Sequence, residues 1–173
     1  MTTPDRDHDQ PDLRPRPVSE SETTLAQLML LTDANPAGNV HGGTIMKLVD
    51  TAGGIAASRH AQRRVVTVMM DSMTFLHPVY VGDLLMLHAR LTWTGRTSME
   101  VEVVVEAEHV PTGRVTQTSI AYLVYVALDE AGRPTPVPPL LVQTDEERRR
   151  WAAAEARRAH RLTQRARADE PPA

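Results

Sequence analysis

The sequence predicts an α+β fold in which one buried helix is followed by four long strands. A run of small and apolar residues with few charges predicts a buried helix over 42–59. The strand-type runs that follow it are joined by short turns, which favour antiparallel pairing. A chain of 173 residues fits one domain with tails. We therefore expect an antiparallel sheet that covers the helix.

Residues 1–22 predict a disordered N-terminal tail. They hold four prolines, six acidic and three basic residues, and few large apolar side chains. Such a segment buries too little surface to offset the entropy lost on ordering. We place the folded domain at 23–142.

The helix over 42–59 reads GGTIMKLVDTAGGIAASR, and its only charges are Lys47, Asp50 and Arg59. A helix that is apolar or small nearly all round is buried. Gly53 and Gly54 each cost about 1 kcal/mol relative to alanine in a helix interior. Close packing of a neighbouring element is the expected compensation.

The predicted strands follow in order. In the third of them Glu100 and Glu102 alternate with Val101 and Val103, the pattern of a half-buried strand. Residues 129–139 hold four prolines and leave the sheet. The four strands are Val65–Leu76, Leu84–Thr94, Ser98–His109 and Val115–Leu128.

The C-terminal segment predicts an arginine-rich helix over 143–168 and a short tail over 169–173. Residues 146–168 carry eight arginines against three glutamates. Two interpretations remain open: a solvated surface helix, or a positive surface that attracts a polyphosphate or a nucleic acid.

Composition excludes several classes. The absence of cysteine rules out disulfides, cysteine nucleophiles and thiolate metal sites. A net charge of -3 gives no reason to expect nucleic acid or anionic membrane as a partner. No apolar run approaches a membrane span and no signal peptide is evident, so we expect a cytoplasmic protein.

Sequence motifs exclude others. There is no G-x-S-x-G elbow of a serine hydrolase and no glycine-rich nucleotide motif. The seven histidines show no metal-ligand spacing, so no metal site is predicted.

The loop over 35–43, NPAGNVHGG, leads directly into the buried helix. A helix N-terminus presents unpaired N–H groups and a partial positive charge. Gly42 and Gly43 would let a ligand approach those donors, which suits a carbonyl to be polarised or an anion. The alternative is that the glycines only satisfy a tight turn.

Asp50 lies on the same helix. A carboxylate in apolar surroundings is costly unless it is paired, hydrogen-bonded or exposed. We interpret it as a general base or nucleophile, with a structural aspartate as the alternative. Gly43 and Asp50 are separated by roughly 10 Å along the helix axis, and Asn39 lies further back. One reacting centre cannot easily reach Asn39 and Asp50 of the same chain, so we expect at least a dimer.

The run GNVHGGTIMKLVDTAGGIAASRH resembles the acyl-CoA thioesterases of the hotdog fold, specifically the bacterial single-domain relatives of brain acyl-CoA hydrolase. The later runs VVTVMMDSMTFLHPVYVGDLL and TGRTSMEVEVVVEAE fit the same family. The resemblance covers roughly residues 22–165. It implies a central helix wrapped by a curved antiparallel sheet, sheets joined across a homodimer, and dimers assembled into hexamers. It also implies hydrolysis of fatty acyl-CoA to fatty acid and CoA, with no cofactor because CoA is part of the substrate.

By resemblance, the catalytic asparagine falls on Asn39 and the catalytic aspartate on Asp50. Asn39 and the backbone N–H of Gly43 would polarise the thioester carbonyl. Asp50 of the neighbouring chain would activate water, or attack directly to form an anhydride. His41 and Gly42 are assigned to substrate binding, although His41 could instead orient the loop.

CoA would lie in a groove leading out of this site. Arg96 is the candidate for its phosphates because a guanidinium matches phosphate oxygens, with hydroxyl donors from Thr97 and Ser98 beside it. An ordinary polar hairpin is the alternative for these three residues. Two rival functions also remain: a hotdog hydratase or dehydratase on acyl thioesters, and a non-catalytic acyl-CoA sensor.

Overall fold

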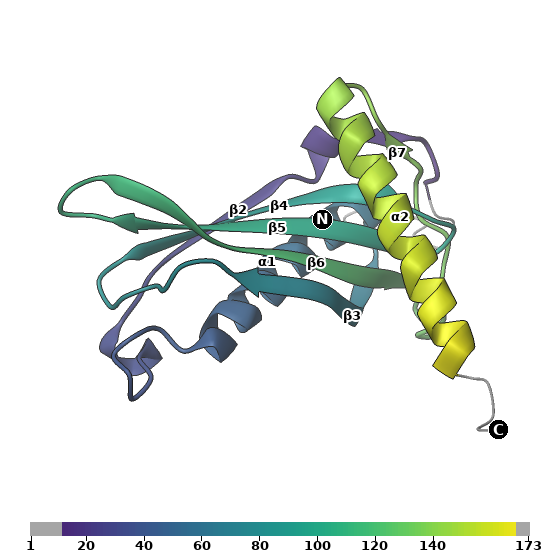
Figure 1. Ribbon diagram of the computed structural model, residues 1–173. Coiled ribbons are helices and arrows are strands. Elements are labelled where there is room, and N and C mark those ends of the chain that lie inside the picture. Colours follow the sequence, from purple (N-terminus) through teal and green to yellow (C-terminus); the bar gives the residue numbers. More distant parts are fainter. Residues whose placement is uncertain (1–11, 169–173) are drawn as a thin grey trace, which may run out of the picture.

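The computed structural model describes residues 12–168. Helix α1 (Gly42–Ala61) packs against one face of a five-stranded antiparallel sheet with strand order β2-β4-β5-β6-β3 (Figure 1). The predicted layout, one helix followed by four long strands, is confirmed. The strands are β2 (Thr23–Leu28), β3 (Arg64–Phe75), β4 (Leu84–Thr94), β5 (Ser98–His109) and β6 (Arg114–Leu128).

The N-terminal segment departs from the predicted tail. β1 (Arg16–Pro17) pairs in parallel with β7 (Leu140–Leu141), and the 3-10 turn η1 (Val18–Glu20) follows. Val18 is buried, and Arg16 donates to the backbone oxygen of His60 at 3.1 Å. The prediction of disorder is therefore wrong for residues 12–22. Hydrogen bonds and one buried apolar side chain order this segment although it holds few apolar residues. Residues 1–11 lie outside the described range.

Strand β2 is a further element that the sequence pattern did not reveal. It pairs with β4 and forms one edge of the sheet. Its sequence TTLAQL shows only weak alternation, and most of its side chains are exposed. Beyond it, the short 3-10 turn η2 (Leu31–Asp33) leads into the loop before α1.

Small residues let α1 lie close to the sheet. Val49, Ala52, Ala56 and Ala57 are fully buried on the face of α1 that meets the strands. The predicted close approach at Gly53 is also present, and the group that approaches is the ring of Tyr125 on β6. The short side chains thus set the helix-to-sheet distance.

Strand β3 forms the other edge of the sheet and carries an unusual number of exposed apolar side chains. Its pairing with β6 is interrupted by two irregularities, between Thr67 and Met69 and between Met70 and Ser72. Such bulges bend a strand and turn side chains to new directions. The exposed apolar residues on or just after β3 are Val66, Val68, Met69, Phe75 and Leu76.

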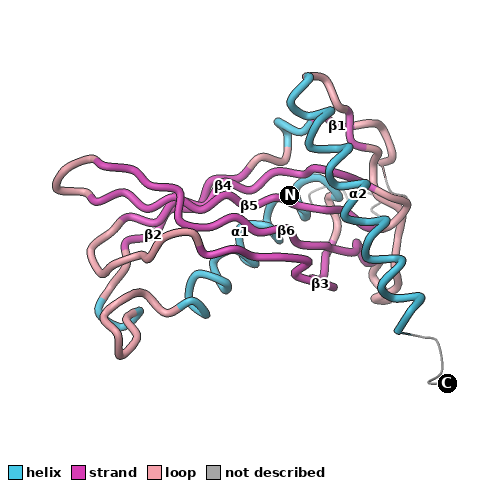
Figure 2. Tube along the Cα trace, viewed as in Figure 1, coloured by secondary structure: helices cyan, strands magenta, loops and turns pink. Residues whose placement is uncertain are grey.

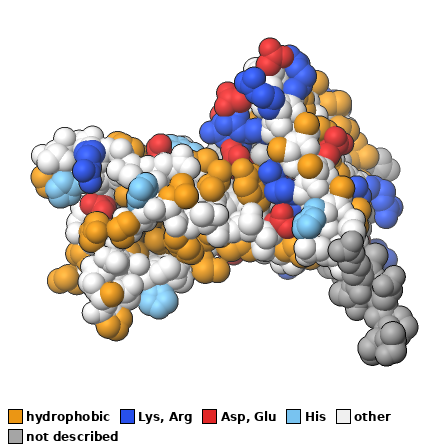
Figure 3. All heavy atoms as spheres, in the orientation of Figure 1, with side chains coloured by type: hydrophobic (Ala, Val, Ile, Leu, Met, Phe, Trp, Pro, Cys, Tyr) orange, Lys and Arg blue, Asp and Glu red, His pale blue; other side chains and the backbone are white. Residues whose placement is uncertain are grey.

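Helix α2 (Asp145–Ala168) crosses the face of the sheet opposite to α1 (Figures 1 and 2). Trp151 packs against Trp93 of β4 with ring centroids 6.2 Å apart, and Ala154 is fully buried. Figure 3 shows charged side chains gathered on α2 and hydrophobic side chains over the neighbouring strands. The sheet is therefore covered on both faces at this end.

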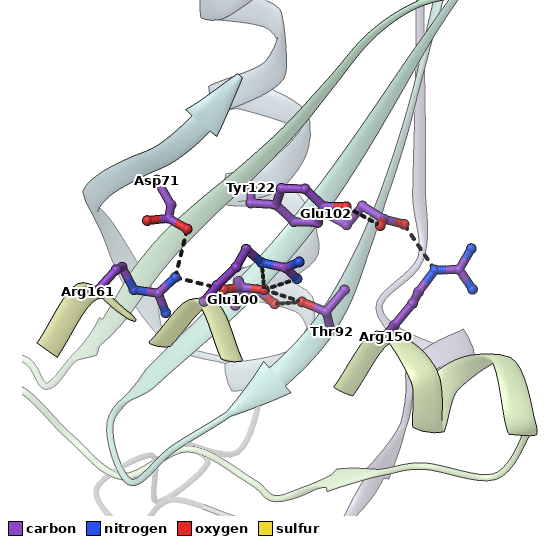
Figure 4. Close-up of polar contacts among 8 residues, drawn as sticks. Asp71, Thr92, Glu100, Glu102, Tyr122, Arg150 and Arg161 are labelled. Carbon is purple, nitrogen blue, oxygen red and sulfur yellow. Dashed lines mark hydrogen bonds and ion pairs between the residues drawn. The ribbon is translucent and has the colours of Figure 1, made fainter. Parts of the chain in front are cut away.

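Carboxylates on β5 hold α2 in place. Glu100 is fully buried and accepts hydrogen bonds from Arg157 at 2.6 Å, Arg161 at 2.9 Å and Thr92 at 3.0 Å (Figure 4). Arg161 also donates to Asp71 of β3 at 3.0 Å. Glu100 and Glu102 thus do not face solvent, contrary to what the pattern of a half-buried strand predicted, because α2 covers them.

A second ion pair lies nearer the start of α2. Arg150 donates to Glu102 at 3.1 Å, and the Tyr122 hydroxyl donates to the other oxygen of Glu102 at 3.1 Å (Figure 4). These ion pairs engage arginines of α2 that the sequence had left available for binding a polyphosphate. Along residues 12–168, none of the helices is long and apolar enough to cross a membrane.

Candidate active site

Asp50 lies in the middle of α1 and receives a hydrogen bond from the neighbouring edge strand. The Thr67 hydroxyl of β3 donates to Oδ1 of Asp50 at 2.6 Å. The bulge that follows Thr67 belongs to the same stretch of β3. In the single chain Asp50 is exposed, and it faces a groove together with Thr67 and Ser58. A carboxylate held at one oxygen and open to a groove has the geometry of a general base, because its other oxygen is accessible to a bound molecule.

A second hydroxyl reaches the same residue from β6. Tyr125 donates to the backbone oxygen of Asp50 at 3.0 Å. Burial, followed by the charge of the Asp50 carboxylate, raises the pKa of Tyr125 well above its usual value of 10. Tyr125 therefore stays protonated at neutral pH and acts as a donor.

The N-terminus of α1 is capped by His41. Its Nδ1 accepts the N–H of Gly43 at 3.0 Å, and its backbone oxygen accepts from Thr44 at 2.9 Å. The Gly43 N–H, which the family resemblance assigned to the thioester carbonyl, is thus engaged by the cap. The N–H of Gly42 makes no hydrogen bond within residues 12–168. Gly42 is therefore the donor that a ligand could use.

Two asparagines lie in the loop before α1, and they are held differently. The side-chain oxygen of Asn35 accepts from the N–H of Ala37 at 2.9 Å and of Asn39 at 3.3 Å. With its oxygen fixed in this way, the amide nitrogen of Asn35 is left as a donor of defined orientation. The side chain of Asn39 makes no hydrogen bond to any residue in the described part of the chain. Both asparagines line one pocket with Gly42 and Phe75.

The asparagines and Asp50 therefore face different pockets in one chain. The pocket at the helix N-terminus holds Asn35, Asn39 and Gly42, and the groove beside Thr67 holds Asp50. Gly42 and Asp50 are eight residues apart on α1, or roughly 12 Å along the axis. A single thioester carbon cannot contact both sets in one chain.

The predicted CoA-binding hairpin lies elsewhere. Arg96 is exposed at the turn between β4 and β5, and the Ser98 side chain lines a groove under α2 with Trp93 and Arg158. Ser98 pairs with Val126, one strand position from Tyr125, so its side chain is on the sheet face opposite to Asp50. The structure does not bring Arg96, Thr97 or Ser98 to the pocket of Asn39 within one chain.

A metal site is not assembled among the residues that the structure describes, since no three His, Asp or Glu side chains converge. His60 is buried and its Nε2 lies 2.9 Å from the backbone oxygen of Pro138. Desolvation by burial lowers the pKa of His60, which fits a neutral ring in the core. His60 serves packing at the end of α1.

The relatives of this chain identify its family. Residues 37–113 match the family described as the thioesterase superfamily. An acyl-CoA thioester hydrolase of Salmonella typhimurium is 38% identical over 122 residues, which cover 69% of this chain and 92% of that protein. The chain belongs to the thioesterase superfamily. The cytosolic acyl coenzyme A thioester hydrolase of Rattus norvegicus is 36% identical over 86% of this chain, and this thioesterase-family chain spans 40% of the length of that relative.

Solved thioesterase structures share the fold. A hexameric acyl-CoA thioesterase superimposes with a TM-score of 0.85 at 40% identity, covering 88% of this chain and 98% of that one. The acyl-CoA hydrolase of Staphylococcus aureus, in complex with butyryl-CoA and CoA, gives a TM-score of 0.82 at 32% identity over 88% and 93%. The expected hotdog-type arrangement of helix and sheet is confirmed.

Variants of the S. aureus hydrolase allow the sequence separation of three residues to be compared. Its structures include single alanine replacements of an aspartate, an asparagine and a threonine. In that enzyme the threonine follows the aspartate by 17 residues, and the asparagine precedes it by 15. In this chain Thr67 follows Asp50 by 17 residues and Asn35 precedes it by 15, whereas Asn39 precedes it by 11.

The sequence pattern alone does not single out Thr67, Asn35 or Tyr125. Thr67 stands in a strand with nothing local to distinguish it from a packing residue. Asn35 was visible as the first residue of the NPAGNVHGG loop, and its side-chain contacts to the loop backbone are the signal that singles it out. Tyr125 gave a weaker signal, a hydroxyl on an otherwise apolar strand face.

Proposed function

We propose that this protein hydrolyses acyl-CoA thioesters to a free acid and CoA, with no cofactor. The observation that carries the proposal is the Asp50 carboxylate, held by Thr67 through one oxygen and open to a groove on the other side. The names of relatives that share most of this chain support the substrate class. The cytosolic relatives support a cytoplasmic location.

We propose Asn35, rather than Asn39, as the side chain that polarises the thioester carbonyl. Its amide is oriented by two loop N–H groups, and its distance along the chain from Asp50 equals that of the S. aureus asparagine. The free N–H of Gly42 is the second donor, in place of Gly43. Both donors line one pocket, as an oxyanion-stabilising pair requires.

The active site is composite. Asn35 and Gly42 of one chain face Asp50 and Thr67 of a second copy, which joins through the exposed apolar edge strand β3. Pairing of two β3 edges would continue the sheet and bury Val66, Val68 and Phe75, which are between 43% and 58% exposed in one chain. Hexameric neighbours support assembly of three such dimers.

In the proposed reaction Asp50 takes a proton from a water molecule, and the oxygen of that water attacks the thioester carbon. The resulting oxyanion is stabilised by the Asn35 amide and the Gly42 N–H. When the carbon–sulfur bond breaks, Asp50 returns the proton to the CoA thiolate. Direct attack by Asp50 would instead form an anhydride that water then hydrolyses. Arg96, Thr97 and Ser98 stay candidates for CoA contacts.

The test is thiol release from a panel of acyl-CoAs, short to long. Wild type should turn over, and Asn35→Ala and Asp50→Ala should each lose activity with the assembly intact. Co-expression of the two inactive chains with different tags should then restore about a quarter of the activity, since half of the two-fold dimers are mixed and each has one complete site.

The same assay separates the rival functions. Wild type that binds acyl-CoA without releasing thiol would favour the sensor, and hydration of an enoyl-CoA would favour the hydratase. Failure of co-expression to restore activity would place both residues in one chain and refute the composite site.

A further inference from the structure

The phenol of Tyr125 sits directly beneath Asp50. Tyr125 is only 1% exposed, and its hydroxyl contacts two atoms of Asp50: the backbone oxygen at 3.0 Å and the carboxylate Oδ1 at 3.5 Å. The first contact fixes the helix backbone at Asp50, and the second lies at the outer limit of a hydrogen bond. One hydroxyl thus restrains both the main chain and the carboxylate of the proposed base.

A glycine of α1 makes room for this hydroxyl. A Cβ added at Gly53 would overlap the Tyr125 hydroxyl and press on two ring carbons at 3.1 and 3.2 Å. The neighbouring buried positions Ala52, Ala56 and Ala57 all carry a Cβ without difficulty. The glycine at 53, costly in a helix interior, is therefore explained by the position of one oxygen atom.

Two hydroxyls converge on the same carboxylate oxygen. Thr67 donates to Oδ1 at 2.6 Å and Tyr125 lies on that oxygen from β6, whereas Oδ2 receives no donor within residues 12–168. Because Tyr125 stays protonated, it remains a donor throughout the neutral range. Oδ2 is thus the oxygen left for water.

We propose that Tyr125 is a positioning residue for the hydrolysis, one that holds Asp50 so that Oδ2 faces the attacking water. This inference rests on the proposed function and deepens it. The competing explanation is that the Tyr125 hydroxyl only satisfies a helix carbonyl in the core. The two differ in what removal of the hydroxyl does to kcat and to KM.

The experiment compares Tyr125→Phe with Tyr122→Phe. The two tyrosines stand on the same strand, and each hydroxyl lies within 3.5 Å of a carboxylate oxygen, but that of Tyr122 donates to Glu102 on the opposite sheet face. Tyr125→Phe should lower kcat by about tenfold, the worth of one hydrogen bond, and leave KM within about twofold. Tyr122→Phe should leave both constants near the wild-type values.

Gly53→Ala supplies an independent test of the same geometry. Its added methyl group should displace the Tyr125 hydroxyl and lower kcat about as much as Tyr125→Phe does. In the Tyr125→Phe background, Gly53→Ala should lower kcat by less than about a further twofold, because the atom that it displaces is absent. Melting temperature and assembly state are measured for every variant.

Each outcome has one meaning. Unchanged kcat in Tyr125→Phe, in a preparation whose wild type is active, overturns the positioning role and leaves the thioesterase intact. A joint rise in KM and loss of assembly overturns it in favour of a structural role. Full additivity of Gly53→Ala and Tyr125→Phe contradicts the shared geometry. Absence of thiol release from the wild type removes the proposed function itself.

Discussion

Thr67 and Asp50, 17 residues apart in the sequence, are joined by a 2.6 Å hydrogen bond that links strand β3 to helix α1. The donor stands where β3 departs from regular pairing with β6, so the bulge and the bond belong to one feature of the edge strand. The contact ties the proposed base to the strand through which a second copy is proposed to join.

Thr67→Ala is predicted to lower kcat for acyl-CoA hydrolysis by about tenfold or more. A hydrogen bond to a charged acceptor contributes about 1.5–3 kcal/mol, and its loss frees the Asp50 carboxylate to rotate. Thr67→Ser keeps the hydroxyl and should retain most of the activity. Steady-state thiol release measures both, and a Thr67→Ala enzyme as fast as wild type would contradict the role.

The two asparagines of the loop are predicted to differ. Asn35→Ala should lower kcat/KM by about a hundredfold or more, the effect of removing one oxyanion donor. Asn39→Ala should cost less than about tenfold, since its side chain holds no loop N–H in the described structure. Equal losses in the two variants, or the reverse order, would return the catalytic role to Asn39.

A charge on the edge strand is predicted to separate the dimer. Val68 is 58% exposed on β3. In Val68→Asp both copies would bring a carboxylate into the proposed interface, where the two charges would be buried without partners. Light scattering should show a lower mass together with loss of activity. Val115→Asp, at a similarly exposed valine on the β5–β6 hairpin, is the matched control. A Val68→Asp protein of unchanged mass would place the interface elsewhere.

The docking of α2 is predicted to depend on Glu100. Glu100→Gln leaves Arg157 and Arg161 facing a neutral amide, and breaking a buried pair costs about 3 kcal/mol at the lower end of the usual range. Relative to wild type, Glu100→Gln should accelerate amide hydrogen exchange more along α2 than along β5. Glu155→Gln, on the same helix, is the control that should change little. Equal protection of α2 in Glu100→Gln and wild type would refute the prediction.

Stability is predicted to fall at mildly acidic pH because of His60. Burial lowers the pKa of His60 below its ordinary value of 6.5, so the unfolded chain binds more protons than the folded one just below that pH. The free energy of unfolding should therefore decrease as pH falls through 6.5 and be unaffected by this group above it. Denaturation series at pH 7.5 and 5.5 measure the slope, and His60→Gln should flatten it. An equal slope in the variant would assign the effect to other groups.

Much of the fold followed from local pattern. The helix over 42–59 and the four long strands carry unambiguous periodicity and turn residues, and the structure has them within a few residues of the expected bounds. Strand β2 and residues 12–22 did not follow, because their order depends on partners distant in sequence, such as the contact of Arg16 with the end of α1.

The site was predictable only where the local sequence singles out a residue. Asp50 stands out as a lone carboxylate on an apolar helix, and the glycines after His41 mark the helix start. Thr67 and Tyr125 acquire meaning only when β3 and β6 are folded over α1. The burial of Glu100 likewise depends on α2, whose docking no strand pattern reveals.

The separation of the two pockets on one chain has a consequence for how the activity is switched on. Each chain carries the two parts of the proposed site in separate pockets, one with Asn35 and one with Asp50. Under the proposed function, a newly synthesised chain would leave acyl-CoA intact until it meets a second copy. At low concentration the rate should rise with the square of the amount of protein, so abundance itself becomes a control on hydrolysis.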